Sequence, residues 1–121
     1  MDLFAATANF AFQEPLGPGA ILLRKFCQQE ERAKTNAVAL LRDLAALVEI
    51  SPLRHMVTPG GFEMSVAMSN CGALGWVTDQ AGYRYQAVDP ETGSPWPSMP
   101  HSFLELAKRA AQIGGFEGFV P

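Results

Sequence analysis

The sequence predicts an α+β fold, in which a long amphipathic helix, a small antiparallel sheet or hairpin and a second amphipathic helix follow one another. Three observations indicate this order. Residues 28–49 contain neither proline nor glycine and carry apolar side chains at helical spacing, and so do residues 102–113. Between them, residues 62–69 alternate between large apolar and mostly polar side chains, which is typical of a half-buried strand. With 121 residues, the chain has the size of a single domain.

The N-terminal residues are predicted to form an arm followed by a short strand. Prolines and glycines gather at positions 15–19, where they favour an extended or turning backbone. The run "AILLRKF" at 20–26 is apolar enough for a buried strand. We therefore expect an extended arm over residues 1–19 and a folded body over residues 20–121.

The first helix is expected to run from residue 28 to residue 49 and to end at the Ser-Pro pair of residues 51 and 52. Its apolar stripe consists of Val38, Leu41, Leu44, Ala45 and Val48. This stripe is widened by Leu40 and Leu47. The charged side chains expected to face away are Arg42, Asp43 and Glu49. An amphipathic helix of this kind covers one side of a core.

The central part is predicted to be a small sheet built around turns. A Pro-Gly-Gly turn at 59–61 precedes the alternating strand at 62–69, and shorter strands are expected at 76–78 and 83–86. The expected inner face of the alternating strand is Phe62, Met64, Val66 and Met68. The proline-rich residues 89–100 are expected to form an irregular loop.

The second helix is expected over residues 102–113 and is stopped by two glycines. Its apolar face consists of Phe103, Leu106, Ala107 and Ala110.

Composition limits the classes of function. The net charge is −3, whereas a protein that holds nucleic acid mainly by neutralising phosphates is usually basic, so the charge argues against a general DNA coat. A small site that grips a base by stacking remains open. No apolar run reaches the roughly 20 residues that cross a membrane, and the N-terminus lacks the basic region of a secretory signal. Cys27 and Cys71 lie too far apart for a paired metal motif, so we expect a reducing cytoplasm.

No recognisable catalytic motif is present in these 121 residues. Neither His55 nor His101 has a carboxylate two residues away, and no phosphate-binding glycine loop or CxxC pair occurs. We interpret His55 as a surface or turn residue. Cys71 is interpreted as a small buried or turn residue, because no base or run of cations lies beside it.

The stretch "NCGALGWVTDQAGYRY" at 70–85 supports two interpretations. Trp76, Tyr83 and Tyr85 are aromatic residues at predicted strand positions, and such residues most often belong to a core. Alternatively they form a platform on which a planar ring stacks, because Tyr83 and Tyr85, two residues apart, share one face of a strand. Met64 and Met68 allow the same two roles, since methionine fills cores and also lines adaptable binding surfaces.

The segments "MVTPGGFEMSVAMSNCGALGW", "GYRY" and "DPETGSPWPSMPHSF" resemble the N-terminal part of the bacterial AlkB family. The resemblance extends from about Gly19 to Pro121 and is densest between Met56 and Phe103. It implies the N-terminal portion of a double-stranded β-helix, or jelly-roll, dioxygenase that uses Fe(II) and 2-oxoglutarate. Enzymes of this family remove methyl groups oxidatively from 1-methyladenine and 3-methylcytosine in DNA, acting on a base flipped out of its strand.

The resemblance also implies roles for single residues. Trp76 matches the ring that stacks on the flipped base, and Tyr83 matches a hydroxyl that reaches a substrate phosphate. The remaining substrate-contacting positions that it implies are Thr58, Met64, Met68, Arg84 and Tyr85. The implied partner is alkylated single- or double-stranded DNA, with RNA as an alternative.

The iron-binding His-x-Asp and distal histidine of the family have no match in this chain, nor do its 2-oxoglutarate-binding arginines. Three protein ligands on one face are the minimum for such iron chemistry. We therefore expect the chain to recognise substrate, to hold no cofactor itself, and to be inert without a catalytic barrel or a second chain. Two alternatives stay open: a stand-alone nucleic-acid-binding module, and a protein that docks on a partner through its leucine stripe.

Overall fold

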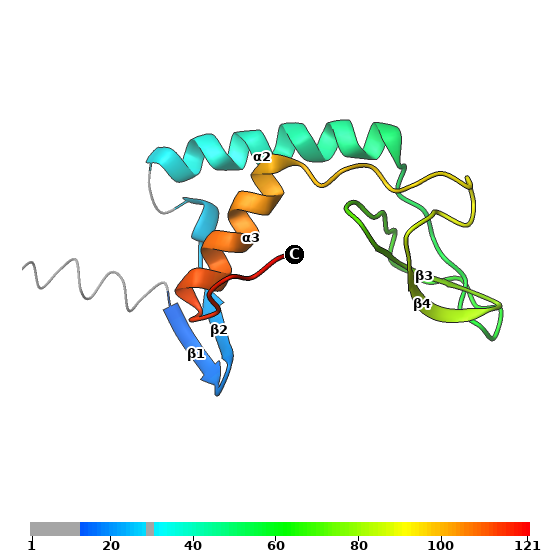
Figure 1. The fold of residues 1–121 in the computed structure, drawn as a ribbon, viewed down its shortest axis with the longest axis horizontal. Helices are drawn as coiled ribbons and strands as arrows, with labels where there is room; N and C mark the ends of the chain where they lie inside the picture. The colour runs from blue at the N-terminus through cyan, green and yellow to red at the C-terminus, as the bar shows by residue number, and fades with distance from the viewer. Residues whose placement is uncertain (1–12, 29–30) are drawn as a thin grey trace, which may run out of the picture. The chain divides into compact units, whose positions relative to one another are not determined.

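The computed structural model describes residues 13–28 and 31–121. Over these ranges it contains two α-helices, a short 3-10 helix and two antiparallel two-stranded sheets, so the predicted α+β class is confirmed. The described residues divide into two compact units, one reaching to Leu41 and resuming at His101, the other comprising Arg42–Pro100. Figure 1 shows the strands β1 and β2 as one hairpin and β3 and β4 as another.

In the first unit, strand β1 (Gln13–Gly17) pairs with β2 (Ala20–Leu23) around a turn in which Gly19 has a φ of 74°. The hairpin thus spans positions 19 and 20, where we expected the arm to meet the body. Residues 1–12 of that arm lie outside the described residues. The prediction of a buried strand over 20–26 was wrong in burial and in length. Only alternate residues of β2 are partly covered, because one face of this two-stranded hairpin is open to water, and the 3-10 helix η1 (Phe26–Gln28) follows.

Helix α3 (His101–Ile113) forms as predicted and begins one residue earlier. Its C-terminus is closed by hydrogen bonds from Gly114 N–H to the Ala110 carbonyl and from Phe116 N–H to the Ala111 carbonyl. Gly115 adopts a φ of 89°, a left-handed conformation that suits glycine at a helix end.

The apolar face of α3 joins the β2 strand in an apolar groove of about 580 Å³ within the first unit. The groove is lined by Ile21, Leu23, Phe26, Leu40, Phe103, Leu106, Ala107 and Ala110. Arg109 contacts one of these residues, with its guanidinium carbon 5.0 Å from the centre of the Phe26 ring. Leu40 of α2 thus lines the same groove as the apolar face of α3.

Helix α2 (Glu31–Ile50) confirms the first predicted helix, with its start shifted three residues along the chain. The Ser51 N–H bonds to the Leu47 carbonyl, and Pro52 then ends the helix as expected. The prediction of which side of this helix is buried was wrong. Val38 is 66% exposed, whereas Leu47 is only 7% exposed. The covered side is that of Leu40 and Leu47, and most of the central stripe faces water.

In the second unit, the strand predicted over 62–69 is wrong. This segment runs antiparallel to residues 54–57 but meets them only in isolated bridges, Arg54 with Met68 and Val57 with Glu63. The two bridges differ in register by two residues, so the extra length bends out at residues 65–66 and interrupts the ladder. Phe62 and Val66 are exposed, and only the two methionines of the expected inner face are partly buried.

Strands β3 (Gly75–Asp79) and β4 (Gly82–Gln86) confirm the two shorter predicted strands. They form a hairpin whose register pairs Trp76 with Tyr85, Val77 with Arg84 and Thr78 with Tyr83. The unit's core is a cluster of Met56, Val77 and Trp96, of which Val77 is 1% exposed. Residues 89–100 contain no helix or strand, as predicted, yet they supply Trp96 to this core.

No helix in the described ranges is long and apolar enough to span a membrane.

Candidate functional site

The three aromatic residues predicted from the sequence come together on one face of the β3–β4 hairpin. Directly paired residues of an antiparallel ladder share a face, so the register places Trp76, Thr78, Tyr83 and Tyr85 on the same side. The Trp76 and Tyr83 rings are stacked, with centroids 5.8 Å apart and planes inclined by 21°. Tyr83 is 61% exposed and Tyr85 is 72% exposed, while Trp76 is half-buried. The face therefore presents rigid rings to water at the surface of a strand pair.

Such a face suits a planar ligand. Flat aromatic rings bind other rings by stacking, and this contact contributes about 1–3 kcal/mol per nucleobase in proteins that bind single strands. The phenol hydroxyls can also donate a hydrogen bond to a phosphate or to a base edge. The interpretation of all three rings as core residues is wrong for the two exposed tyrosines, and it holds in part for Trp76.

The backbone beneath Trp76 is held by a side chain that the sequence reasoning missed. Asn70 accepts a hydrogen bond from the Trp76 N–H at 3.0 Å through Oδ1, and its Nδ2 donates to the Trp76 carbonyl at 2.9 Å. Gly75 is required next to it, because a Cβ at this position would overlap the Trp96 ring and the Cβ of Asn70. The "N-x₄-G-W" spacing in the chain was the available signal, but nothing local shows which backbone an asparagine will meet.

Met64, Met68 and Trp76 are partly buried and pack against the Met56–Val77–Trp96 core cluster. The structure thus brings both predicted methionines to the same cluster as the stacking ring. Trp96 is anchored below them by a hydrogen bond from its Nε1–H to the Gln86 carbonyl, at 2.7 Å. Of the three rings, Trp76 therefore packs against the core of the unit.

Arg84 lies on the other face of the hairpin, opposite Val77, and is not brought together with the rings. Its guanidinium binds both carboxylate oxygens of Asp79, at 2.8 and 2.9 Å, and donates to the Gln86 side chain at 2.8 Å. These hydrogen bonds from Arg84, together with the Ala81 N–H, hold the pKa of the Asp79 carboxyl below its ordinary value. The positive charge of Arg84 is therefore already paired within the hairpin.

Thr58 occupies a separate turn, the predicted Pro-Gly-Gly turn. Its hydroxyl accepts the Phe62 N–H at 3.1 Å, and its backbone bonds to Phe62 and Gly61. Gly61 has a φ of 89°, which explains why the turn uses a glycine there. The structure gives Thr58 a clear local role, that of closing this turn.

A buried ion pair links the beginning and the end of the second unit, and sequence reasoning missed it. Arg54 donates to both carboxylate oxygens of Asp89, each at 2.8 Å, and also pairs with Glu91 at 2.8 Å. The Arg54 guanidinium lies 5.5 Å from the centre of the Trp96 ring. Asp89 is only 5% exposed, and the hydrogen bonds from Arg54 hold the pKa of its carboxyl below the ordinary value despite burial. The local signal was the Asp-Pro-Glu-Thr-Gly turn, in which Asp89 also caps the Glu91 N–H.

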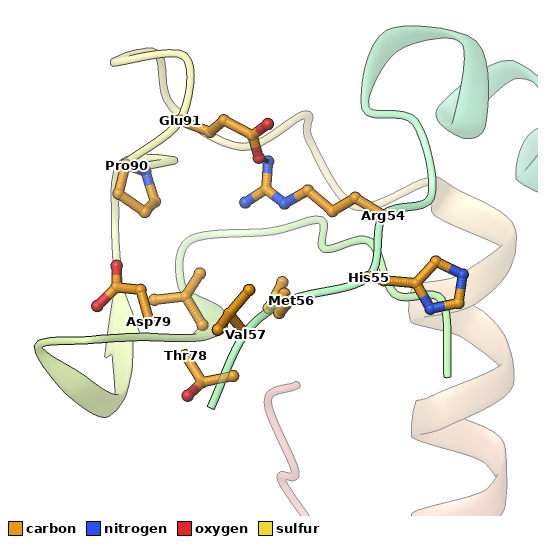
Figure 2. Close-up of a pocket in the computed structure, with 9 residues that line it drawn as sticks. Arg54, His55, Met56, Val57, Thr78, Asp79, Pro90 and Glu91 are labelled. Atoms are coloured by element: carbon orange, nitrogen blue, oxygen red, sulfur yellow. Dashed lines mark ion pairs between the residues drawn. The ribbon is translucent and has the colours of Figure 1, made fainter. Parts of the chain in front are cut away.

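A pocket of about 370 Å³ lies beside this ion pair. Figure 2 shows residues that line it, with the Glu91 carboxylate next to the Arg54 guanidinium. The pocket is lined by residues 54–57, 77–79, Pro90 and Glu91. The charged side chains Arg54, Asp79 and Glu91 are engaged in ion pairs, and the buried hydroxyl of Thr78 has no hydrogen-bond partner among the described residues. Because each of these charged side chains is already engaged in an ion pair, we assign ligand recognition to the ring face instead.

The other candidate groups occupy ordinary positions. His55 is exposed, with Nδ1 2.8 Å from the Met64 carbonyl, as expected for a surface residue. His101 lies in the first turn of α3, with Nε2 3.8 Å from Glu105. Cys71 is half-buried, and burial raises the pKa of its thiol.

Within residues 13–28 and 31–121, no three His, Cys, Asp or Glu side chains come close enough to hold a metal ion. The donor set that iron requires is therefore not met by the described residues.

Comparisons with known proteins agree with one another. The sequence profile of the 2OG-Fe(II) oxygenase superfamily matches residues 19–121. The alpha-ketoglutarate-dependent dioxygenase AlkB of Escherichia coli K12 is 49% identical over 121 residues, covering 100% of this chain and 52% of that protein. AlkB of Salmonella typhimurium LT2 is 50% identical with the same coverage, and an AlkB homolog of Caulobacter vibrioides NA1000 is 47% identical over 68 residues, 56% of this chain and 31% of that protein. The chain spans about half the length of the curated relatives from the first two bacteria.

Proposed function

Since this chain belongs to the AlkB family of the 2OG-Fe(II) oxygenase superfamily, we propose that it is the substrate-recognition part of a DNA-repair dioxygenase. The substrate is an alkylated base, such as 1-methyladenine or 3-methylcytosine, presented outside its strand. The observation that carries this proposal is the exposed ring face of the hairpin, where Trp76 and Tyr83 are already stacked.

A methylated base is a favourable ligand for such a face. Methylation at N1 of adenine or N3 of cytosine leaves a cationic ring that cannot form its normal base pair, so extrusion from the helix costs less. A cationic ring is attracted to the π-electrons of tryptophan and tyrosine. The net charge of −3 also agrees with binding through stacking more than through phosphate neutralisation.

We assign the residue roles as follows. Trp76 stacks on the base, the Tyr83 hydroxyl reaches a neighbouring phosphate, and Tyr85 extends the ring face to the next nucleotide. Met64 and Met68 support the ring from the core side, where both pack. Thr58 shapes the turn of a nucleotide-recognition lid, and Arg84 stiffens the hairpin through Asp79 before any contact with substrate.

We propose that residues 20–121 form this lid with its supporting helices, that residues 1–19 precede them as an arm, and that the complete enzyme places them beside a jelly-roll barrel. Fe(II) and 2-oxoglutarate are proposed cofactors of that complete enzyme. The described residues do not fit an iron site, so no step of the oxidation is assigned to them, and the chain alone is proposed to be inert. A cytoplasmic location and RNA as a second substrate stay predictions.

Fluorescence titration tests the proposal directly. A short single-stranded oligonucleotide containing 1-methyladenine is added to the chain without iron or 2-oxoglutarate, and tryptophan emission is recorded. Saturable quenching is expected, because a base stacked on Trp76 quenches its emission, and the quenching should disappear in Trp76→Phe while Trp96 still reports the folded state. The unmodified oligonucleotide is the matched control and should bind more weakly. Absence of any saturable change in a folded sample would overturn base recognition by this chain.

One observation favours a second candidate, a protein that docks on a partner through a helix. The exposed side of α2 carries Val38, Leu41 and Leu44, which are 66%, 68% and 45% exposed. Exposed apolar stripes of this kind mark interfaces. Leu41→Lys should abolish association under this alternative and leave the oligonucleotide titration unchanged, whereas Trp76→Ala should do the reverse. A stand-alone nucleic-acid-binding module would bind in the titration without any need for a barrel.

A further inference from the structure

We propose that Asn70 is a positioning residue for the stacking ring, which it orients by holding the backbone of Trp76. The inference rests on the proposed function of Trp76 as the base-stacking residue. It concerns a side chain that does not belong to the ring face itself.

The argument begins with the edge of strand β3. In an antiparallel pair, alternate residues point their N–H and C=O groups toward the partner strand and away from it. The N–H and C=O of Trp76 are both taken by Asn70, which is not part of β4, so these groups lie on the outer edge of the hairpin. Without Asn70, the only neighbour of Trp76 in the sheet would be β4.

The side-chain amide of Asn70 thus makes the two backbone hydrogen bonds that a neighbouring strand would make to Trp76. This one planar group accepts a hydrogen bond from the Trp76 N–H at 3.0 Å and donates one to the Trp76 carbonyl at 2.9 Å. Two bonds to one residue restrain its position along the strand and also the rotation of its peptide planes. Because the Cα–Cβ direction follows the backbone, this restraint sets where the indole ring leaves the strand.

Asn70 is itself held firmly enough to act as a support. Two residues along the chain, the Gly72 N–H donates to the Pro97 carbonyl at 2.8 Å, which fixes the backbone of this turn. Gly75 leaves the space for the Cβ of Asn70 that any larger residue would fill.

The consequence for binding is pre-organisation. A base that stacks on a ring already fixed in place loses less conformational entropy on binding than one that must first order the ring. Asn70 should therefore affect affinity for the modified base although it lies outside the proposed binding face. Removal of the restraint is expected to weaken binding about three- to tenfold, the range for one newly immobilised side chain.

The first measurement uses the unaltered chain. Amide hydrogen exchange followed by NMR should show the Trp76 N–H protected by at least tenfold over an unstructured peptide, since Asn70 holds it. Exchange at the unprotected rate would overturn the proposal, and this result does not depend on any variant folding.

The second measurement compares Asn70→Ala with Ser69→Ala. Each substitution removes side-chain hydrogen bonds from the same turn, but only the first touches Trp76. Time-resolved fluorescence anisotropy, with the Trp96 contribution obtained from Trp76→Phe, should show greater ring motion in Asn70→Ala only. Equal ring motion in both alanine variants, or no change in either, would overturn the positioning role.

Titration of the same variants with the 1-methyladenine oligonucleotide completes the test. Asn70→Ala should bind three- to tenfold more weakly, and Ser69→Ala should bind as wild type does. Unchanged affinity in Asn70→Ala, with wild-type binding intact, would overturn the inference. If the wild-type chain does not bind at all, the proposed function fails, and the exchange and anisotropy results still decide whether Asn70 orders the ring.

Discussion

Replacement of Arg54 by methionine is expected to destabilise the second unit more than any other single change to its polar side chains. The variant keeps most of the side-chain length but removes the guanidinium that binds Asp89 through two hydrogen bonds of 2.8 Å. The Asp89 carboxylate is 5% exposed, so water cannot replace these bonds without a rearrangement. Backbone N–H groups of Glu91, at 2.9 Å, and of Thr92 would still donate to the carboxylate, but no positive charge would face it.

The magnitude follows from the general cost of leaving a buried charge without its partner, about 3–5 kcal/mol. Asp89→Asn should cost less, because the arginine is 23% exposed and keeps its contact with Glu91 at 2.8 Å. The double variant Arg54→Met/Asp89→Asn should recover part of the loss, since it leaves no uncompensated charge. The expected order of stability is therefore wild type, Asp89→Asn, then Arg54→Met.

Urea unfolding followed by Trp96 fluorescence measures this order, in a Trp76→Phe background so that a single tryptophan reports. With a slope of about 1–2 kcal/mol per molar urea for a small unit, Arg54→Met should lower the midpoint by about 2 M or abolish cooperative unfolding. A loss under about 1 kcal/mol for Arg54→Met, or a larger loss for Asp89→Asn, would refute the reasoning.

The pH dependence supplies an independent check on the same pair. Hydrogen bonds from Arg54 hold the folded pKa of Asp89 below its ordinary value, and an unfolded aspartate titrates near about 3.9. The pair's contribution is then complete above the unfolded pKa and is lost as pH falls through the folded pKa. Wild type should lose stability between about pH 5 and the folded pKa, and in Arg54→Met this acid-side slope should become shallower.

Three further predictions concern packing and reactivity. Gly75→Ala should cost about 1–3 kcal/mol in urea unfolding, because its Cβ would overlap the Trp96 ring, and a wild-type midpoint would show that the ring can move aside. Cys71 should react with iodoacetamide at pH 8 more slowly than a free thiol, since burial raises its pKa, and the difference should vanish in denaturant; equal rates in the folded chain would contradict its burial. Val38→Lys should change the free energy of unfolding by less than about 0.5 kcal/mol, because Val38 is largely exposed, and a greater loss would place that side of α2 in a contact.

The stretch at 70–85 shows how far the local pattern reaches. Its two strands and the common face of Tyr83 and Tyr85 follow from alternation and from the turn between them, which act over a few residues. The concentration of rings on a weakly charged ribbon left two interpretations open, a core and a platform for a planar ring. Arg84 was assigned to that site through family resemblance, whereas the register places it on the other face, paired with Asp79.

The segment at 62–69 shows where alternation fails. Alternating residues form a strand only if a partner strand offers a continuous ladder of hydrogen bonds. Residues 54–57 do not, because their two bridges to this segment differ in register by two residues. The apolar stripe of α2 fails for a related reason. The apolar stripe is so wide that neighbouring elements can cover either of its two edges. Which leucines are buried therefore depends on which elements pack against the helix.

The sequence by itself determined the α+β class, both helices, the β3–β4 hairpin, the irregular loop at 89–100 and the family to which the chain belongs, because each depends on short-range periodicity or on residue identity. Only the tertiary structure decided which ring faces are exposed, that Asn70 holds Trp76, and that Arg54 meets Asp89 across 35 positions. Hydrogen bonds between distant side chains leave no periodic trace in a sequence, since any arginine can pair with any carboxylate that the fold brings within reach.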